Sequence, residues 1–393
     1  MIDIDRVRLE TPACAHLTHF NNAGCSLMPS VVREKMFNYL ESEQYAGGYE
    51  TAVKYEAELA GMYDSIARLI NCDASEVAFC ESNTRAWQQF FYSLNFSSGG
   101  NIITSRVDYG SNFVAYIHAR KKFGMEIRYI ETDESGDFNL DHLTKLIDAK
   151  TKLISISHIP TGSGLVNSAE DVGEIAWNAG VPFLLDACQS VGHLEVDVAK
   201  IRCTALTATG RKYLRGTRGS GLLYVSRDYC QTAVPAVLEQ QSVDLIDDST
   251  YRLADGARRF ENFESHFGGR IALKEAADYA VAQGAKNIED RIFSLSSYCR
   301  EQLRALDGVT VCDTGSRQCG IVTFNVVGYS PTKIREILGL EHINTWVSSG
   351  PGSLVDFQDR GLDAVNRASL HYFNTKFEID GMCSVLRDLK KSR

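Results

Sequence analysis

Short apolar runs alternate with amphipathic segments along the chain as far as Val225. Each run is typical of a buried strand, and polar turn residues separate it from the next helical pattern. The expected strands are Val77–Cys80, Asn101–Thr104, Ile127–Ile130, Leu153–Ser157, Pro182–Leu185 and Leu222–Val225, and the expected helices between them are Ala86–Leu94, Phe113–Phe123, Leu140–Ile147 and Glu170–Asn178. This alternation predicts an α/β fold with a mainly parallel sheet that carries helices on both faces.

Longer helical patterns and a different order of elements mark the rest of the chain. The spacing of apolar residues predicts single helices over Thr51–Ile70 and Gly269–Leu306. Beyond about residue 250 the alternation weakens, and a strand is expected over Ile343–Val347. A chain of 393 residues exceeds one typical core. We therefore expect a large domain over 17–255 and a smaller α+β domain made of 1–16 and 256–393.

Composition excludes several classes of protein. The net charge of -9 argues against a nucleic-acid-binding protein. No run of apolar residues is long enough to span a membrane, and the charged N-terminus lacks the apolar core of a signal peptide. Eleven cysteines occur without CxxC pairs or the spacing to histidine of a zinc site, so no metal is expected. The chain is predicted to be cytoplasmic.

The segment Ile201–Val225 places Lys212 in a glycine-rich turn between two predicted strands. Asp186 closes the preceding strand. A lysine and an acid in this relation suit pyridoxal phosphate, because the lysine can hold the aldehyde while the acid keeps the ring nitrogen protonated. Each residue alone is more often an ordinary turn or strand-end residue. Their combination with further polar residues at strand ends supports the cofactor site.

Ligands of such sheets bind at the carboxyl ends of the strands. Polar residues that fall there, and that could share one site, are Thr84, Tyr109, Thr161, Asp186 and Lys212. The Ser82-Asn83-Thr84 sequence opens a predicted helix and could bind phosphate through free N–H groups. An ordinary helix N-cap explains the same residues, and both interpretations stay open.

From Asn21 to Thr375 the chain resembles the class V aminotransferase superfamily of pyridoxal phosphate enzymes, of fold type I. The segments GRKYLRG and DACQS carry this resemblance. The segments GCSLMPSVV, NTRAW, INTWVSS and RASLHYFNT look most like the branch of ergothioneine-pathway C–S lyases and isopenicillin N epimerase-like proteins. The resemblance implies a seven-stranded sheet flanked by helices, a small C-terminal domain, bound pyridoxal 5'-phosphate and a homodimer.

The resemblance also implies roles for single residues. Lys212 matches the lysine that forms the Schiff base, and Asp186 matches the acid on the ring nitrogen. The other residues implied at the cofactor are Gln189, Tyr109, Thr84, Arg85, Thr209, Arg211 and Thr161. Arg367 matches the arginine that binds the substrate carboxylate, which its planar fork suits. The other residues implied at the substrate are Asn22, Trp346 and Ser349.

Two departures from the cysteine desulfurases of this superfamily bear on the reaction. Desulfurases carry a cysteine in the loop before the RAS segment, where this chain reads Thr345 to Pro351 without cysteine. Cys319 is expected to be a structural thiol. The turn through which a desulfurase reaches its partner's phosphate is replaced here around Glu264, whose charge disfavours a phosphate.

These features predict a C–S lyase that acts by β-elimination on a cysteine S-conjugate or its sulfoxide and releases a thiol or sulfenate, pyruvate and ammonia. The substrate would be a small amino acid. Tyr49, Trp346 and Tyr372 could line a pocket for the sulfur substituent, although core packing is the commoner role of such aromatics. Transamination, epimerisation or decarboxylation with the same cofactor remain alternatives, cysteine desulfuration is less expected, and a metabolite-binding regulator is the least expected.

Overall fold

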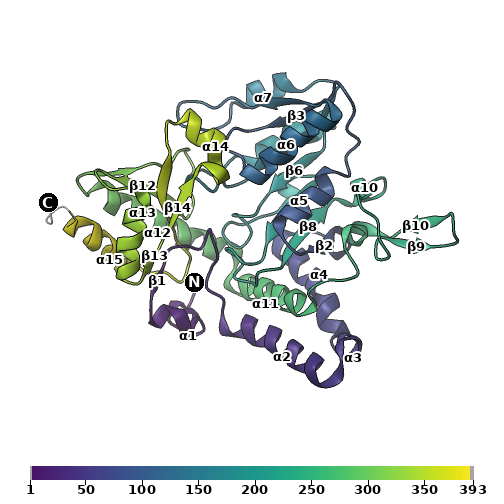
Figure 1. Cartoon of the computed structure of the whole chain (residues 1–393), viewed down its shortest axis with the longest axis horizontal. Helices are drawn as coiled ribbons and strands as arrows, with labels where there is room; N and C mark the ends of the chain where they lie inside the picture. The colour runs from purple at the N-terminus through teal and green to yellow at the C-terminus, as the bar shows by residue number, and fades with distance from the viewer. Residues whose placement is uncertain (1, 390–393) are drawn as a thin grey trace.

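The computed structural model describes residues 2–389, and its centre is a seven-stranded sheet (Figure 1). The strand order is β2-β8-β7-β6-β5-β3-β4. The strands are β2 (Val77–Cys80), β3 (Asn101–Thr104), β4 (Glu126–Tyr129), β5 (Thr151–Ser157), β6 (Phe183–Asp186), β7 (Ala205–Thr209) and β8 (Gly221–Val225). β8 is antiparallel to both neighbours, and the other pairs are parallel. The expectation of a mainly parallel α/β sheet is confirmed.

Apolar side chains cover both faces of this sheet, which explains the continuous apolar runs of its strands. Leu184 packs into one core cluster and Leu185 into another, and Leu222 and Leu223 divide in the same way. The helices between or beside these strands are α4 (Glu56–Ile70), α5 (Asn83–Phe91), α6 (Gly110–Phe123), α7 (Leu140–Leu146), α8 (Ala169–Ala179), α9 (Val198–Ile201), α10 (Arg227–Cys230) and α11 (Phe267–Gln283).

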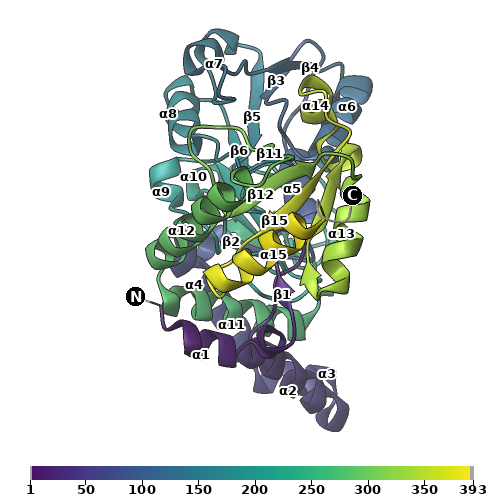
Figure 2. The same ribbon diagram turned by 90° about the vertical axis from the view of Figure 1, so that its left-hand side faces the viewer.

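A second, antiparallel sheet with strand order β11-β12-β15-β14 lies in the C-terminal part. Its strands are β11 (Val309–Val311), β12 (Ile321–Val326), β14 (Trp346–Ser349) and β15 (Ala364–Ser369). The helices of this part are α12 (Ala285–Arg304), α13 (Pro331–Leu340), α14 (Gly350–Asp359) and α15 (Lys376–Asp388). α12 packs against α15, and both supply residues to a third core cluster with β12 and β15 (Figure 2).

The N-terminal residues run along both parts. They form α1 (Ile4–Leu9), the 3-10 helix η1 (Pro12–Ala15), β1 (Thr18–His19), α2 (Ser30–Ala46) and α3 (Gly48–Lys54). β1 pairs in parallel with β13 (Ile343–Asn344) of the C-terminal part. The remaining elements are the 3-10 helices η2 (Ala74–Glu76) and η3 (Gly256–Phe260), and the hairpin of β9 (Val243–Leu245) and β10 (Tyr251–Leu253), which projects from the body (Figure 1).

Three predicted elements are each divided in the structure. The predicted helix Gly269–Leu306 is wrong, because Gly284 with φ of 83° separates α11 from α12. A positive φ suits glycine and interrupts the helical hydrogen-bond ladder. Tyr55 leaves helical geometry and separates α3 from α4. The predicted strand Ile343–Val347 forms parts of β13 and β14, which belong to different sheets.

The proposed domain boundary stays a prediction. It assigns α11 to the small domain, although α11 packs against α2 and α4. Among the described residues, no helix combines the length and the apolar character that crossing a membrane requires.

Candidate active site

The carboxyl ends of several parallel strands meet at one pocket, as expected for an open α/β sheet. Ser157, Asp186 and Thr209 are the last residues of β5, β6 and β7, and all three line the pocket. The remaining lining residues are Glu81, Ser82, Asn83, Thr84, Tyr109, Ile159, Thr161, Cys188, Gln189, Arg211, Lys212 and Gly219. Eight residues implied at the cofactor are thus brought together; these are Lys212, Asp186, Gln189, Tyr109, Thr84, Thr209, Arg211 and Thr161.

Lys212 lies in the turn between β7 and β8 and is only 9% exposed. The turn is closed at its base, where the Gly216 N–H donates to the Gly210 carbonyl at 2.7 Å and the Gly210 N–H donates to Ser220 at 3.0 Å. Gly210 leaves no room for a larger residue, since a Cβ there would lie 2.3 Å from the Ser220 hydroxyl. The lysine amine is therefore held in the pocket by a tightly bonded turn.

The Asp186 carboxylate is buried and accepts three hydrogen bonds. Asn112 donates to one oxygen at 3.1 Å, while Asn83 at 3.2 Å and the Cys188 N–H at 3.0 Å donate to the other. Burial raises the pKa of Asp186, and the hydrogen bond from Asn112 is the first of the effects that oppose it. A protonated ring nitrogen would supply the positive charge that this buried carboxylate needs.

Arg367 extends from β15 toward the same pocket edge and is 4% exposed. It donates to the Thr161 hydroxyl at 2.6 Å and carbonyl at 3.2 Å, and to Asn21 Oδ1 at 3.4 Å. Its Nε has no partner, and no carboxylate of the described residues pairs with it. Burial lowers the pKa of Arg367 to about 10. A buried cation of this kind suits an anionic partner, and a carboxylate has the geometry that its planar fork matches.

Gln189 joins the cofactor pocket to the arginine. Its amide nitrogen donates to the Ala23 carbonyl at 3.1 Å and to Thr161 Oγ1 at 3.3 Å. Its Oε1 is buried without a partner. An unpaired acceptor in a polar pocket fits a hydroxyl group of a bound molecule, such as the ring hydroxyl of pyridoxal phosphate.

The start of α5 and several hydroxyl side chains also line the pocket. α5 begins there, with Ser82 accepting from the Arg85 N–H at 3.2 Å, and Thr84 lines the pocket. Thr209 lies nearby and donates to the Ser220 carbonyl at 3.2 Å. A helix N-terminus with adjacent hydroxyls suits a phosphate group. The pocket fits pyridoxal phosphate because it combines Lys212, the buried Asp186, the unpaired Oε1 of Gln189 and the start of α5.

A second pocket adjoins the first on the side of the small sheet. Tyr109, Thr161, Arg211 and Lys212 line both pockets. The other residues of the second pocket are Ala23, Gly24, Trp346, Val347, Ser348, Ser349, Gly352, Ser353 and Arg367. The predicted substrate residues Arg367, Trp346 and Ser349 therefore lie beside the cofactor pocket.

Two predicted site residues do not line either pocket. Asn22 is fully buried, and its side chain donates to the main chain at His19 and Ser369 and accepts from Ser26. The preceding residue, Asn21, instead contacts Arg367. Arg85 is exposed on α5.

Of the three aromatic residues predicted to line the pocket for the sulfur substituent, one lines the second pocket and two lie elsewhere. Trp346 lines the second pocket, whereas Tyr49 is 76% exposed on α3. Tyr372 is buried against Arg215, whose Nη1 donates to its hydroxyl at 2.7 Å.

Three polar side chains around Asp186 were missed as functional residues. The sequence places Asn83 within the predicted phosphate site, but its amide nitrogen donates a hydrogen bond to Asp186. Asp108 and Asn112 contact each other at 3.0 Å, and Asn112 also contacts Asp186. Asp108 and Asn112 are four residues apart, before and within α6, and this spacing is visible in the sequence. The contact of Asn112 with the distant Asp186 is not visible there.

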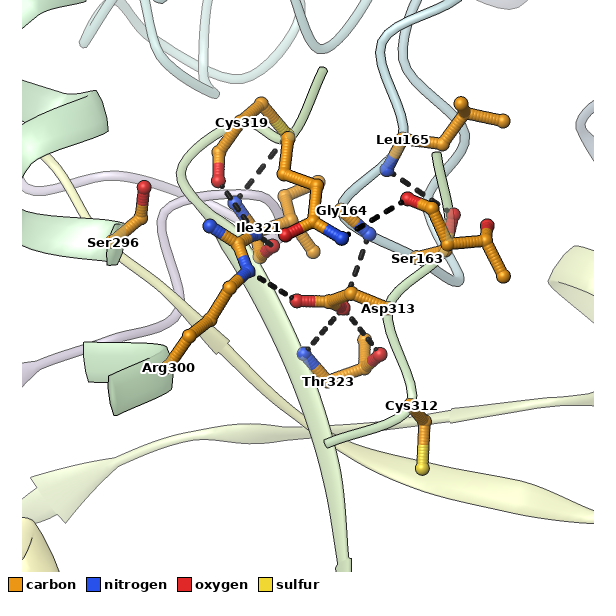
Figure 3. A network of polar contacts seen from close by, with 12 residues as sticks. Ser163, Gly164, Leu165, Ser296, Arg300, Cys312, Asp313, Cys319, Ile321 and Thr323 are labelled. Carbon is orange, nitrogen blue, oxygen red and sulfur yellow. Dashed lines mark hydrogen bonds and ion pairs between the residues drawn. The ribbon is translucent and has the colours of Figure 1, made fainter. Parts of the chain in front are cut away.

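The loop that carries Thr161 is anchored to the small sheet through Asp313 (Figure 3). Asp313 Oδ1 accepts from the Gly164 N–H at 3.1 Å and from the Thr323 hydroxyl at 2.6 Å. Its other oxygen pairs with Arg300 at 2.7 Å, and both side chains are almost fully buried. This network fixes the loop against the sheet from which Arg367 extends.

All eleven cysteines are free, and Cys188 is the one that lines the cofactor pocket. Burial raises the pKa of the Cys188 thiol, although nearby Lys212 opposes the shift. Cys319 is fully buried and accepts from the Ile321 N–H at 3.5 Å. The segment from Trp346 to Asp359 beside Arg367 contains no cysteine.

Comparisons with known proteins agree with this geometry. The sequence profile of the family described as "Aminotransferase class-V" matches residues 18–382. A probable cysteine desulfurase of Pyrococcus abyssi is 28% identical over 398 residues, which cover 98% of this chain and 97% of that protein. The apo structure of a cysteine desulfurase from Thermococcus onnurineus NA1 has a TM-score of 0.93 at 26% identity, covering 100% of this chain and 99% of the other.

The fold also matches that of a cystine C–S lyase called C-DES, solved in complex with its product cysteine persulfide. The TM-score is 0.86 at 21% identity, with 96% of this chain and 99% of the other covered. A C-DES mutant has been solved with glycine covalently linked to its PLP cofactor. The relatives from Pyrococcus abyssi and Thermococcus onnurineus NA1 are both named cysteine desulfurases. These comparisons therefore support the superfamily but not the predicted resemblance to the ergothioneine-pathway branch.

The profile spans most of the chain, the sheet has the architecture of fold type I, and the pocket is lined by a lysine, a buried acid and the start of α5. The chain belongs to the class V aminotransferase family and is a pyridoxal phosphate-dependent enzyme.

Proposed function

We propose that this enzyme is a C–S lyase, which eliminates the sulfur group of a cysteine S-conjugate as a thiol, or that of its sulfoxide as a sulfenate, and with water yields pyruvate and ammonia. The observation that carries the proposal is the wall of the substrate pocket. Trp346, Ser349 and Ser353 line it beside Arg367, and no thiol lines this pocket. Without a nucleophile to take up the sulfur, the sulfur group leaves with its own electrons.

Arg367 is the residue that orients the substrate. Its guanidinium binds the α-carboxylate, and Thr161 and Asn21 hold the guanidinium from the other side. Because this cation is buried, it binds a carboxylate more strongly than an exposed arginine would. The substrate amine then lies toward Lys212, which lines the same pocket.

Pyridoxal phosphate supplies an aldehyde that captures the amine and a ring that takes up electrons from the α-carbon. Asp186 keeps the proton on the ring nitrogen through its buried carboxylate. The Lys212 amine would hold the cofactor and, where it is free, would act as the general base for the α-proton. Tyr109 lines both pockets and would contact the cofactor ring there.

Cysteine desulfurase is the second candidate, supported by the names of the relatives. That reaction transfers sulfur to a protein thiol and forms alanine instead of pyruvate. Cys188 is the pocket thiol, but it lies beside Asp186 and Lys212 and not among the residues of the substrate pocket. This placement favours the lyase.

Product analysis separates the candidates. The purified holoenzyme is incubated with cysteine, cystine, S-alkylcysteines and their sulfoxides, and pyruvate, alanine and protein-bound persulfide are measured. The lyase predicts pyruvate equal to the substrate consumed and, with the S-alkylcysteines, no persulfide on any cysteine-containing peptide. Alanine with a persulfide identifies a desulfurase. A keto acid that requires an amino acceptor, or inversion without pyruvate, would overturn both.

A homodimer and a cytoplasmic location belong to the same proposal. Leu245, Ile246 and Tyr251 of the projecting hairpin region and Phe263 near Glu264 are exposed apolar residues that a second copy could cover. The free cysteines suit a reducing compartment. Light scattering of the holoenzyme tests the dimer, and a monomeric mass would contradict it.

A further inference from the structure

Asp108 is a second buried carboxylate behind the cofactor pocket, 1% exposed, at the start of α6. One oxygen accepts from the Tyr109 N–H at 2.7 Å and from Ser157 at 2.5 Å. The other accepts from the Tyr116 hydroxyl at 2.6 Å and from Thr104 at 3.3 Å. Burial raises the pKa of Asp108, and the hydrogen bonds from Ser157, Tyr116 and the Tyr109 N–H oppose that shift. Several donors directed at one buried carboxyl group suit its ionised form.

Asn112 connects this carboxylate to Asp186. Its single amide nitrogen donates to Asp108 at 3.0 Å and to Asp186 at 3.1 Å. An amide group has two hydrogens, so each carboxylate receives one of them. This arrangement fixes the rotation of the Asn112 side chain, since turning the amide over would present an oxygen to two carboxylates.

We propose that Asp108 is a positioning residue for the cofactor: through Asn112 it holds Asp186 in place, and its negative charge strengthens the hold of Asp186 on the ring-nitrogen proton. Two carboxylates in one buried network repel each other, and the positive charge of a protonated ring nitrogen next to Asp186 would relieve that repulsion. Removing the charge of Asp108 weakens the demand for this positive charge. The inference concerns the cofactor alone and holds for a lyase or a desulfurase.

The test measures the ring nitrogen directly. Wild type and Asp108→Asn are loaded with ¹⁵N-labelled pyridoxal phosphate, and the ¹⁵N chemical shift is followed from pH 6 to 9, alongside the cofactor dissociation constant. In Asp108→Asn we expect the ring nitrogen to lose its proton at a lower pH than in wild type, so that its ¹⁵N shift reaches the unprotonated value earlier in the titration. We also expect cofactor binding to weaken about tenfold. Asp108→Glu, which retains the charge, should restore most of the wild-type shift.

Asn112→Ala keeps both carboxylates but removes the bridge. It should reproduce part of the change, and it serves as the deciding variant where Asp108→Asn does not fold. Asp356→Asn is the matched control, because Asp356 is a buried carboxylate that pairs with Arg360 away from Asp186. A wild-type ¹⁵N profile in Asp108→Asn, or in Asn112→Ala where that variant decides, would overturn the proposal. Equal changes in Asp356→Asn would do the same.

Discussion

Trp346 and Arg367 are direct partners across the antiparallel strands β14 and β15. Cross-strand partners point to the same face of a sheet, with their side chains in contact distance. Both line the second pocket, so the proposed carboxylate-binding residue and the aromatic residue proposed to border the substituent have a fixed spacing. Arg335 stacks on the Trp346 ring, 4.5 Å from its centroid. The proposed substrate site is therefore built on paired strands of one sheet.

Replacement of Arg367 by lysine should lower kcat/KM about 10- to 100-fold, mainly by raising KM. Lysine retains the charge but cannot form the paired hydrogen bonds of the guanidinium, each of which is worth about 1.5–3 kcal/mol to a charged partner. Steady-state kinetics with the best substrate of the panel provide the measurement. Arg335→Lys is the control, and an equal loss in both variants would contradict the role of Arg367.

Asp186→Ala should reduce kcat on the order of 10² to 10³-fold, the usual effect of removing one preorganised electrostatic contact. The free energy of unfolding of the cofactor-free protein should change by no more than about 2 kcal/mol, a typical value for a single substitution. Turnover and urea unfolding are measured on the same preparations. Wild-type turnover would refute the assigned role.

Asp313→Asn should destabilise the protein by about 3–5 kcal/mol, because it leaves the buried Arg300 without its partner. KM should also rise, since the loop that holds Thr161 loses its anchor at Gly164. Asp244→Asn, which breaks an exposed pair with Arg252, should cost less than about 1 kcal/mol. Denaturant unfolding and KM are the readouts, and equal stability of the two variants would contradict this account.

His158 makes stability sensitive to acid. Burial, assisted by Arg317, lowers the pKa of His158 to about 3, whereas an unfolded histidine titrates near pH 6.5. Between these values the unfolded chain binds a proton that the folded protein does not, so stability falls as the pH falls from about 6.5. His158→Asn should reduce the loss of unfolding free energy between pH 7.5 and 5 by up to about 2 kcal/mol.

The matched control for this prediction is His16→Asn, because His16 is exposed. Urea unfolding at the two pH values gives the comparison. An unchanged pH dependence in His158→Asn would show that this histidine does not carry the effect.

Patterns of adjacent residues were enough to predict the sheet and the centre of the site. The run that ends at Asp186 is apolar on both faces, and Lys212 stands in a turn between two such runs, so both fall at the same sheet edge. The break at Gly284 was missed, because one glycine within a strongly helical pattern is compatible with a continuous helix until packing selects its positive φ.

The sequence by itself determined the sheet, the placement of Lys212 and Asp186 at one edge of it, and the absence of a cysteine in the segment beside Arg367. Only the tertiary structure decided which polar side chains face the site. Asn21 and Asn22 are neighbours in the chain, but Asn21 reaches Arg367 and Asn22 bonds to the main chain at Ser369. The direction of a side chain in a turn depends on partners hundreds of residues away. The same holds for the network of Asp108, Asn112 and Asp186, whose members meet only when two strand ends are brought together.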